Sequence, residues 1–394
     1  MEEERALNER LRIALVSVQD ATDLRTFSGI TYHVLEQLRE QGVDVEVISP
    51  LKRDFRYILA PAAILARIRK RGSSMEHYRY ALRSYARQIV DRLRQRPVDV
   101  VFATSSIPIA LLPQPVPMVF WTGSLYRQME DYYGGAFGNP TPSARRRGRQ
   151  QEELALKRAT FAIYASRWAA DAARQLTDPA KIRILPWGAG VKVQHTSHDV
   201  SGWAEKKRAQ RPNQCELRFI GIDWERKGGT LAVEIARLLN QQGIRTRLRV
   251  AGCRPVEALP DFVEVIGHVN KRTPEGRQRF EDLCRDADFF ILPTKAEAAG
   301  IVFCEACAYG LPSITFDTGG VSDYVRHQVT GFCFPVETGP DAFASAIRET
   351  IEDQQRYQAL AANAFHEYET RLNWKTSASG LIEILRETKR RAFQ

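Results

Sequence analysis

The sequence predicts an α/β protein with two domains, each built around a parallel sheet. Short apolar runs that fit buried strands alternate with segments of helical periodicity in both halves of the chain, which is the pattern of doubly wound sheets. The 394 residues suffice for two domains of ordinary size. Hydrophobic residues make up 44% of the chain and charged residues 26%, as is typical of a soluble globular protein.

The excess positive charge is confined to one half of the chain. Residues 1–195 contain 30 Lys/Arg against 20 Asp/Glu, whereas residues 196–394 contain 27 of each, so the net charge of +10 belongs to the first half. Residues 52–96 hold thirteen Lys/Arg with apolar residues and tyrosines between them. Such a segment can lie on an anionic membrane surface, a candidate partner that Arg145–Arg147 and Arg149 also favour. The alternative is a solvated basic face on a helix that packs on the core.

Other features restrict the compartment and the chemistry. No apolar run is long enough to span a membrane, and the acidic start MEEERALNERLR is unlike a signal peptide. We therefore expect a cytoplasmic protein, attached peripherally to the inner face of the membrane if at all.

Cys304 and Cys307 form a C-x-x-C without a second pair, and His195 and His198 lack partner ligands, so we expect reduced thiols, no metal and no cofactor. No nucleic-acid recognition motif accompanies the basic charge.

The first half opens with a strand, a loop and a helix. Leu11–Val18 fits a buried strand, and a helix from Ile30 to about Gln41 ends at Gly42 as its C-cap. Ser28 and Gly29, at the start of this helix, are candidates for contacting a phosphate or an acceptor, although a simple N-cap explains them equally well. Four further strands are expected, at 43–48, 98–103, 117–121 and 160–165.

The strand at 117–121 ends in the polar segment WTGSLYRQMED. Open α/β sheets place their ligands at the carboxyl ends of strands. Thr122, Ser124, Tyr126 and Asp131 are therefore candidates for contacting an acceptor. Residues 191–213 lack hydrophobic periodicity and read as a linker between the domains.

The second half begins with a strand at 216–220, followed by the loop GIDWERKGG and a helix at 230–240. Gly221 and Gly228 let the backbone approach a ligand, while Arg226 and Lys227 place two cations at the start of the helix. A diphosphate would be held there by charge and by the helix dipole. An exposed basic turn is the alternative. Further strands are expected at 247–251 and 263–267. His268 follows the second of these strands and either lines a ligand-binding cleft or caps a helix.

A third segment, PTKAEAAGIVFCEACAYGLP at 293–312, carries two glutamates, Glu297 and Glu305. It directly follows the apolar run FFIL, which fits a buried strand, so Glu297 lies just past a strand end. Gly300 permits close approach of a ligand, and the helix expected from Ile301 would direct its free N–H groups to an anion. Two carboxylates at this spacing can accept hydrogen bonds from sugar hydroxyls. A solvated loop end and a helix cap are the alternative roles.

Glu297, Glu305 and the following EACAYGLPSITFDTGG resemble the donor-site signature of the retaining nucleotide-sugar glycosyltransferases of family 4 (group 1), which have the GT-B fold. The resemblance implies that Glu297 contacts the transferred sugar, that Glu305 holds the ribose and that Lys227 binds the donor phosphates. It also implies donor contacts for the backbone at Gly300, Ile301 and Val302 and at Gly319 and Gly320. Glu297, Arg226 and Lys227 are then the expected catalytic residues.

The chain departs from the family pattern at two positions. Gly221-Ile222 stands where family members frequently have Gly-Arg, so the role of that arginine passes to Arg226. Gly123 stands where relatives commonly carry a histidine or aspartate, which puts side-chain catalysis on the acceptor side in doubt.

The resemblance implies two Rossmann-like domains that face each other across a cleft. We expect an acceptor domain at 1–190, a linker at 191–213, a donor domain at 214–372 and a C-terminal helix at 373–394 that returns to the first domain. The expected reaction is metal-independent, retaining transfer of a hexosyl group from a UDP- or GDP-sugar to a glycan, glycolipid or other hydroxyl acceptor, in cell-envelope polysaccharide synthesis. The alternatives are a GT-B epimerase or hydrolase, and a basic membrane- or nucleic-acid-binding protein with a vestigial donor site.

Overall fold

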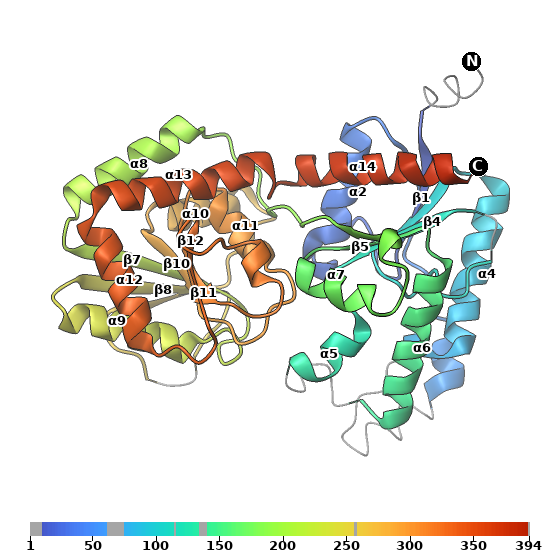
Figure 1. The fold of residues 1–394 in the computed structure, drawn as a ribbon, viewed down its shortest axis with the longest axis horizontal. Helices are drawn as coiled ribbons and strands as arrows, with labels where there is room; N and C mark the ends of the chain where they lie inside the picture. Colours follow the sequence, from blue (N-terminus) through green and yellow to red (C-terminus); the bar gives the residue numbers. More distant parts are fainter. Residues whose placement is uncertain (1–9, 61–74, 114–115, 134–139, 256–257, 393–394) are drawn as a thin grey trace. The chain divides into compact units, whose positions relative to one another are not determined.

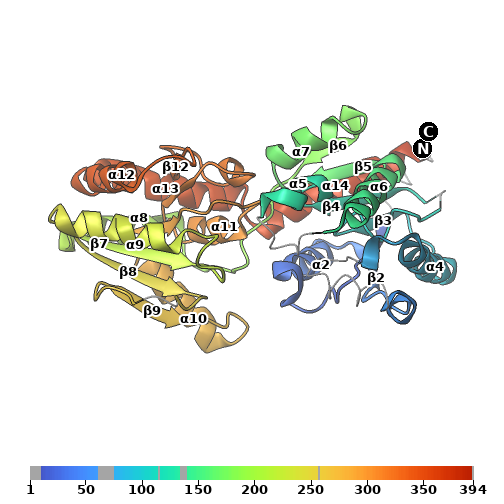
Figure 2. The same cartoon turned by 90° about the horizontal axis from the view of Figure 1, so that it is seen from below.

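The computed structural model of the chain divides into two compact units. Unit 1 comprises Met1–Leu185 and Trp374–Gln394, and unit 2 comprises Pro186–Asn373. Each unit contains one six-stranded sheet flanked by helices (Figures 1 and 2). Every strand pair is parallel, so the expected α/β class with two doubly wound sheets is confirmed. The structure describes residues 10–60, 75–113, 116–133, 140–255 and 258–392.

The sheet of unit 1 has the strand order β2-β1-β3-β4-β5-β6. Its inner strands are continuous apolar runs because helices cover both faces, whereas the edge strand β2 is only partly buried. The strands are β1 Arg12–Val16, β2 Asp44–Ile48, β3 Val100–Ala103, β4 Met118–Thr122, β5 Phe161–Tyr164 and β6 Ile182–Ile184. The helices are η1 Thr26–Gly29, α2 Ile30–Glu40, η2 Met75–His77, α4 Arg79–Gln95, α5 Tyr126–Tyr132, α6 Pro142–Arg158, α7 Arg167–Arg174, η3 Pro179–Lys181 and α14 Trp374–Arg391.

The C-terminal helix α14 packs within unit 1, against α2, β3 and β4. Its first residue, Trp374, stacks on His33 of α2 with ring centroids 5.6 Å apart. Near its other end, Lys389 Nζ lies 3.2 Å from the Asp99 carboxylate. The last helix of the chain thus completes the first unit.

The sheet of unit 2 has the strand order β12-β11-β10-β7-β8-β9. The order reverses between β7 and β10, which lie side by side although about seventy residues separate them in the chain. The strands are β7 Gln214–Ile220, β8 Arg245–Ala251, β9 Val263–Gly267, β10 Phe289–Leu292, β11 Ser313–Phe316 and β12 Gly331–Phe334. The helices are α8 Ser197–Gln210, α9 Gly229–Gln241, α10 Pro274–Arg285, α11 Ile301–Cys307, η4 Val321–Asp323, α12 Pro340–Glu352 and α13 Gln354–Thr370.

The prediction of a linker at 191–213 is wrong, because most of this segment forms α8 within unit 2. Thr196 and Asp199 form a capping box at its start, with the Thr196 amide donating to Asp199 at 2.8 Å. The helix packs on α13. The sequence of α8 shows little hydrophobic periodicity, because two of its buried positions hold Lys207 and Arg208 in place of apolar residues.

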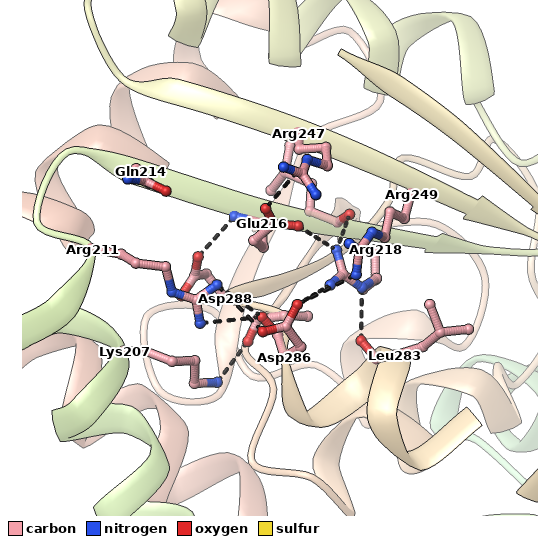
Figure 3. A network of polar contacts seen from close by, with 12 residues as sticks. Lys207, Arg211, Gln214, Glu216, Arg218, Arg247, Arg249, Leu283, Asp286 and Asp288 are labelled. Atoms are coloured by element: carbon pink, nitrogen blue, oxygen red, sulfur yellow. Dashed lines mark hydrogen bonds and ion pairs between the residues drawn. The ribbon is translucent and has the colours of Figure 1, made fainter. Parts of the chain in front are cut away.

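A network of polar contacts, which includes the buried ion pair of Arg208 and Asp288, joins α8 to the amino edge of the sheet, the side on which its strands begin (Figure 3). Asp288, directly before β10, accepts hydrogen bonds from Arg208 Nη2 at 2.5 Å and from the Glu216 amide at 2.7 Å. Arg218, whose side chain is 1% exposed, bonds Glu216 at 3.1 Å. Burial lowers the pKa of Lys207 to about 8, and its amino group donates to the carbonyl of residue 287 at 2.6 Å. Since buried charges persist only when they are paired, the network is part of the architecture of unit 2.

The basic segment at 52–96 is only partly described. Its residues 61–74, which include Arg67, Arg69 and Lys70, lie outside the described residues. In the part of the chain that the structure describes, no helix is long and apolar enough to cross a membrane.

Candidate functional site

The candidate donor site lies at the carboxyl ends of β7 and β10, the two central strands of unit 2. Two loops leave the sheet there: residues 221–228 lead from β7 to α9, and residues 293–300 lead from β10 to α11. The strand order reverses between these two strands. In open α/β sheets this reversal creates the crevice in which ligands bind.

The two loops are in direct backbone contact at Gly228. This residue has φ +78°, and a Cβ atom added to it would lie 2.1 Å from the Pro293 carbonyl oxygen. The Lys295 amide donates to the Arg226 carbonyl at 3.0 Å. Gly221, at the start of the first loop, packs on the stem of Lys227, because an added Cβ would lie 3.3 Å from its Cγ. Gly228, which was expected to admit a ligand, thus brings the two loops themselves together, whereas Gly221 packs within the first loop.

Lys227 and Arg226 converge on Glu297 from the opposite loop. The Lys227 ammonium donates to the Glu297 carboxylate, and Arg226 Nη1 lies 3.8 Å from the same oxygen. Arg226 is oriented by a bond to the Ala296 carbonyl at 2.7 Å and by Asp223 at 3.1 Å. The side chains of Lys227 and Glu297 are 11% and 16% exposed, so the pair is shielded but not closed off from solvent. The sequence predicted all three charged residues, and the structure brings them together.

Glu305 forms a second ion pair in the same unit. It lies in α11, is 5% exposed and accepts a hydrogen bond from Lys271. Lys271 belongs to the segment between β9 and α10, which the sequence analysis passed over because a single lysine in a polar loop carries no local signal.

The start of α11 and the loop after β11 complete the arrangement around Glu297. Gly300 caps α11 with φ +49°, and an added Cβ would lie 2.4 Å from the Phe303 ring, so only glycine fits. Ile301 and Val302 open the helix, but α11 spans only seven residues, too few for a strong dipole. The expected anion contacts therefore rest mainly on the side-chain cations and on the longer helix α9. Beyond β11, the Gly320 amide donates to the Glu297 carbonyl at 3.1 Å, and Gly319 beside it has φ +58°.

Four of the acceptor-side candidates share the carboxyl edge of the sheet in unit 1. Ser28 and Gly29, with φ of 55° and 75°, precede α2 after β1. Thr122 ends β4, with Ser124 two residues on, and both are half-buried. Asp131 does not join them, because it lies near the end of α5 and bonds Arg145 at 2.8 Å.

The same edge carries a polar contact that the sequence analysis did not identify. Thr31 in the first turn of α2 donates to Thr104 after β3 at 3.1 Å, and both side chains are buried. Neither residue stands in a recognisable motif, so only the fold reveals the pair.

Most of the arginines at 145–149 have structural partners. Arg149 bonds Glu130 at 2.5 Å, and Arg145 lies 3.7 Å from the same carboxylate. Arg147 lies over the Tyr78 ring at 3.9 Å. These contacts weaken the prediction that the cluster serves an anionic acceptor or a membrane.

Of the residues considered as metal ligands, the cysteines are buried and His195 is partly buried, whereas His198 is exposed. His195 Nε2 hydrogen-bonds the Ala308 carbonyl at 2.6 Å, and His198 lies on the exposed side of α8. His268 is exposed. All six cysteines are free and buried, and burial raises the pKa of the Cys307 thiol to about 12 and that of Cys304 as well. Among the described residues, no group of three or more His, Cys, Asp or Glu is placed to hold a metal ion.

Comparison with known families agrees with this geometry. A model described as Glycosyltransferase Family 4 matches residues 30–193, and a model described as Glycosyl transferases group 1 matches residues 204–367. Together the two matches account for more than half of the chain. The chain belongs to the group 1 glycosyltransferases of family 4.

Two curated relatives of this family member match it over part of their length. The D-inositol 3-phosphate glycosyltransferase of Rhodococcus jostii is 27% identical over 220 residues, which is 53% of this chain and 48% of that protein. The amylovoran biosynthesis glycosyltransferase AmsK of Erwinia amylovora is 28% identical over 187 residues, 43% of this chain and 44% of that protein. The chain spans about half the length of the curated relatives it matches.

A solved structure shares the whole fold of this glycosyltransferase family member. Anabaena Alr3699/HepE in complex with UDP-glucose has a TM-score of 0.61 and 15% sequence identity, covering 96% of this chain and all of that one. The likeness confirms the expected GT-B class of two Rossmann-like units.

Proposed function

We propose that the chain transfers a hexosyl group from a UDP- or GDP-sugar to a hydroxyl acceptor with retention of the anomeric configuration. The observation that carries this proposal is the convergence of Arg226 and Lys227 on Glu297 at the switch point of the sheet in unit 2. It combines two cations for a diphosphate with a carboxylate for a sugar, in the place where this class of sheet binds nucleotides.

In the proposed reaction, the bond between the anomeric carbon and the β-phosphate oxygen breaks while a bond to the acceptor oxygen forms on the same face. The acceptor proton passes to the departing phosphate. Negative charge develops on that phosphate, and the positive groups of Arg226 and Lys227 stabilise it without reorganisation. Glu297 exchanges its contact with Lys227 for hydrogen bonds to the transferred sugar. These cations supply the charge for which a metal would otherwise be needed.

The names of two related proteins suggest substrates for this chain. The Anabaena protein was crystallised with UDP-glucose, which favours UDP as the nucleotide. The Erwinia relative is named for amylovoran biosynthesis, which favours an envelope or extracellular polysaccharide as the destination of the sugar. In unit 1, the polar edge that holds Ser28, Gly29, Thr122 and Ser124 is the proposed acceptor site.

Calorimetric titration with UDP, GDP and ADP, with and without EDTA, tests this function. We expect one diphosphate to bind in both conditions and Lys227→Ala to weaken it by about tenfold or more, since a hydrogen bond to a charged group contributes roughly 1.5–3 kcal/mol. The matched control is Lys206→Ala, which removes the same charge from an exposed position on α8. Binding that Lys227→Ala leaves unchanged would contradict the site.

A transfer assay with the corresponding labelled nucleotide sugar distinguishes the chemistry. Glu297→Ala should abolish incorporation into membrane or glycan extracts, and full activity in this variant would contradict the proposed role. If free sugar is released rapidly from the nucleotide sugar, and adding an acceptor extract does not change the rate of this release, the hydrolase alternative is favoured.

We further propose that unit 1 attaches peripherally to the cytoplasmic face of an anionic membrane. Tyr57 and Tyr80 are 88% and 52% exposed. In the described part of 52–96, Arg56, Arg79, Arg83 and Arg87 are exposed as well. Aromatic and basic side chains together suit a lipid headgroup layer. We expect salt-sensitive sedimentation with phosphatidylglycerol vesicles that falls when Arg79, Arg83 and Arg87 are replaced by serine. Unchanged sedimentation of that variant would reduce this face to a solvated helix surface.

A further inference from the structure

Glu305 is a buried carboxylate with one cationic partner. It is 5% exposed, and such a group is costly to bury unless it is paired. Lys271 donates to Oε1, and no other hydrogen bond to this carboxylate is present within the described residues. Because a carboxylate offers about four acceptor positions on two oxygens, Glu305 retains acceptor capacity for a ligand beside the ion pair.

Lys271 is itself held at both ends. Its backbone belongs to a tight turn in which the Thr273 amide donates to the Asn270 carbonyl at 3.2 Å. Gly276 of α10 approaches that turn so closely that an added Cβ would lie 1.9 Å from the Asn270 carbonyl oxygen. The Lys271 ammonium lies 4.8 Å from the centre of the Phe280 ring, a cation–π contact that restricts the long side chain.

This rigidity separates Lys271 from an ordinary surface lysine. Lysine side chains lose substantial rotamer entropy when they are fixed, so an exposed ion pair contributes little. Here the turn and the aromatic ring already restrict the Lys271 side chain, so part of its rotamer entropy is lost before a ligand binds. The ammonium therefore fixes the rotamer of Glu305 in advance, which is the condition for a selective hydrogen-bond acceptor.

We propose that Lys271 is a positioning residue: it orients Glu305 to accept hydrogen bonds from the ribose hydroxyls of the donor nucleotide, and so makes the site selective for ribonucleoside over deoxyribonucleoside diphosphates. This inference rests on the proposed function, which places the nucleotide between the β7 and β10 loops. In this proposal Lys271 acts through its contact with Glu305 and not through the transferred sugar or the diphosphate.

The test is calorimetric titration of the full chain with UDP and GDP and with their 2′,3′-dideoxy forms. In the wild-type protein we expect the dideoxy form of the bound nucleotide to bind about tenfold or more weakly, because hydrogen bonds from two hydroxyls to a charged group are lost. In Lys271→Met we expect this ratio to fall below about threefold, because Glu305 no longer has a fixed orientation. A merely structural lysine would change both affinities and leave their ratio unaltered.

Three further variants complete the design. Lys271→Arg should retain the selectivity. Lys206→Met, which makes the same change at an exposed lysine on α8, should leave it unchanged. If Lys271→Met does not fold, Lys271→Gln provides the same comparison. A folded Lys271→Met or Lys271→Gln protein that keeps the wild-type ratio would overturn the proposal. If the wild-type protein binds neither UDP nor GDP, the proposed function fails as well, so the two failures are distinguishable.

Discussion

The two edges of the sheet in unit 2 both contain buried charges, but they use them differently. At the amino edge, Arg208 and Asp288 have side chains 2% and 0% exposed, so each is enclosed with its partner. At the carboxyl edge, Lys227, Glu297 and Lys271 have side chains 11%, 16% and 35% exposed. An enclosed pair can only hold protein segments together. A pair that reaches solvent can exchange one partner for a ligand, so the comparison separates architecture from binding within one domain.

The largest effect is expected at the enclosed edge. Asp288→Ala leaves Arg208 buried without its carboxylate, which should lower the free energy of unfolding by about 3–5 kcal/mol. Urea denaturation measures this loss. The matched control is Asp282→Ala. It removes the same charge from a side chain that is 51% exposed and whose partner Arg285 is 46% exposed, and it should cost about 1 kcal/mol or less. Equal losses in the two variants would show that enclosure does not decide the role of these charges.

The next effect concerns the contact between the two site loops. Gly228→Ala places a Cβ against the Pro293 carbonyl at a residue with φ +78°. We expect a backbone cost of about 1–2 kcal/mol and displacement of Lys227, with nucleotide affinity reduced by about tenfold, or roughly 1.4 kcal/mol.

Gly243→Ala is the control for that variant, because Gly243 has φ +86° but nothing within 4 Å of an added Cβ. It should show the backbone cost in the denaturation curve and unaltered nucleotide affinity. Loss of binding in both variants would mean that the strained backbone conformation, and not the approach of the two loops, lowers the nucleotide affinity.

The same comparison explains which features the sequence could predict. The carboxyl edge was predictable because apolar strand runs end at glycine-containing loops, and parallel strands bring such loops to one edge. Lys227 and Glu297 could therefore be placed near each other without coordinates. The amino edge was not predictable, since Lys207 and Arg208 occupy buried positions of α8 that a hydrophobic pattern reserves for apolar residues. Lys271 was missed for a related reason: its partner Glu305 lies 34 positions along the chain, and only the strand order brings the two together.

The smallest effect tests whether the open edge exchanges partners. The Glu297 carboxylate accepts a hydrogen bond from Lys227, so it would compete with an incoming diphosphate for the ammonium. Glu297→Gln removes that competitor. We expect UDP or GDP to bind a few-fold more tightly, in line with about 0.5–1 kcal/mol for a partly exposed pair, while sugar transfer is lost because the contact to the sugar is weakened.

Glu225→Gln makes the matched control, since it removes one charge from an exposed position in the same loop. It should alter neither the affinity for the diphosphate nor the rate of transfer. If Glu297→Gln instead binds the diphosphate more weakly, Glu297 orients Lys227 rather than competing for it. The carboxyl edge would then resemble the amino edge, with an ion pair that serves the architecture first and the ligand only through it.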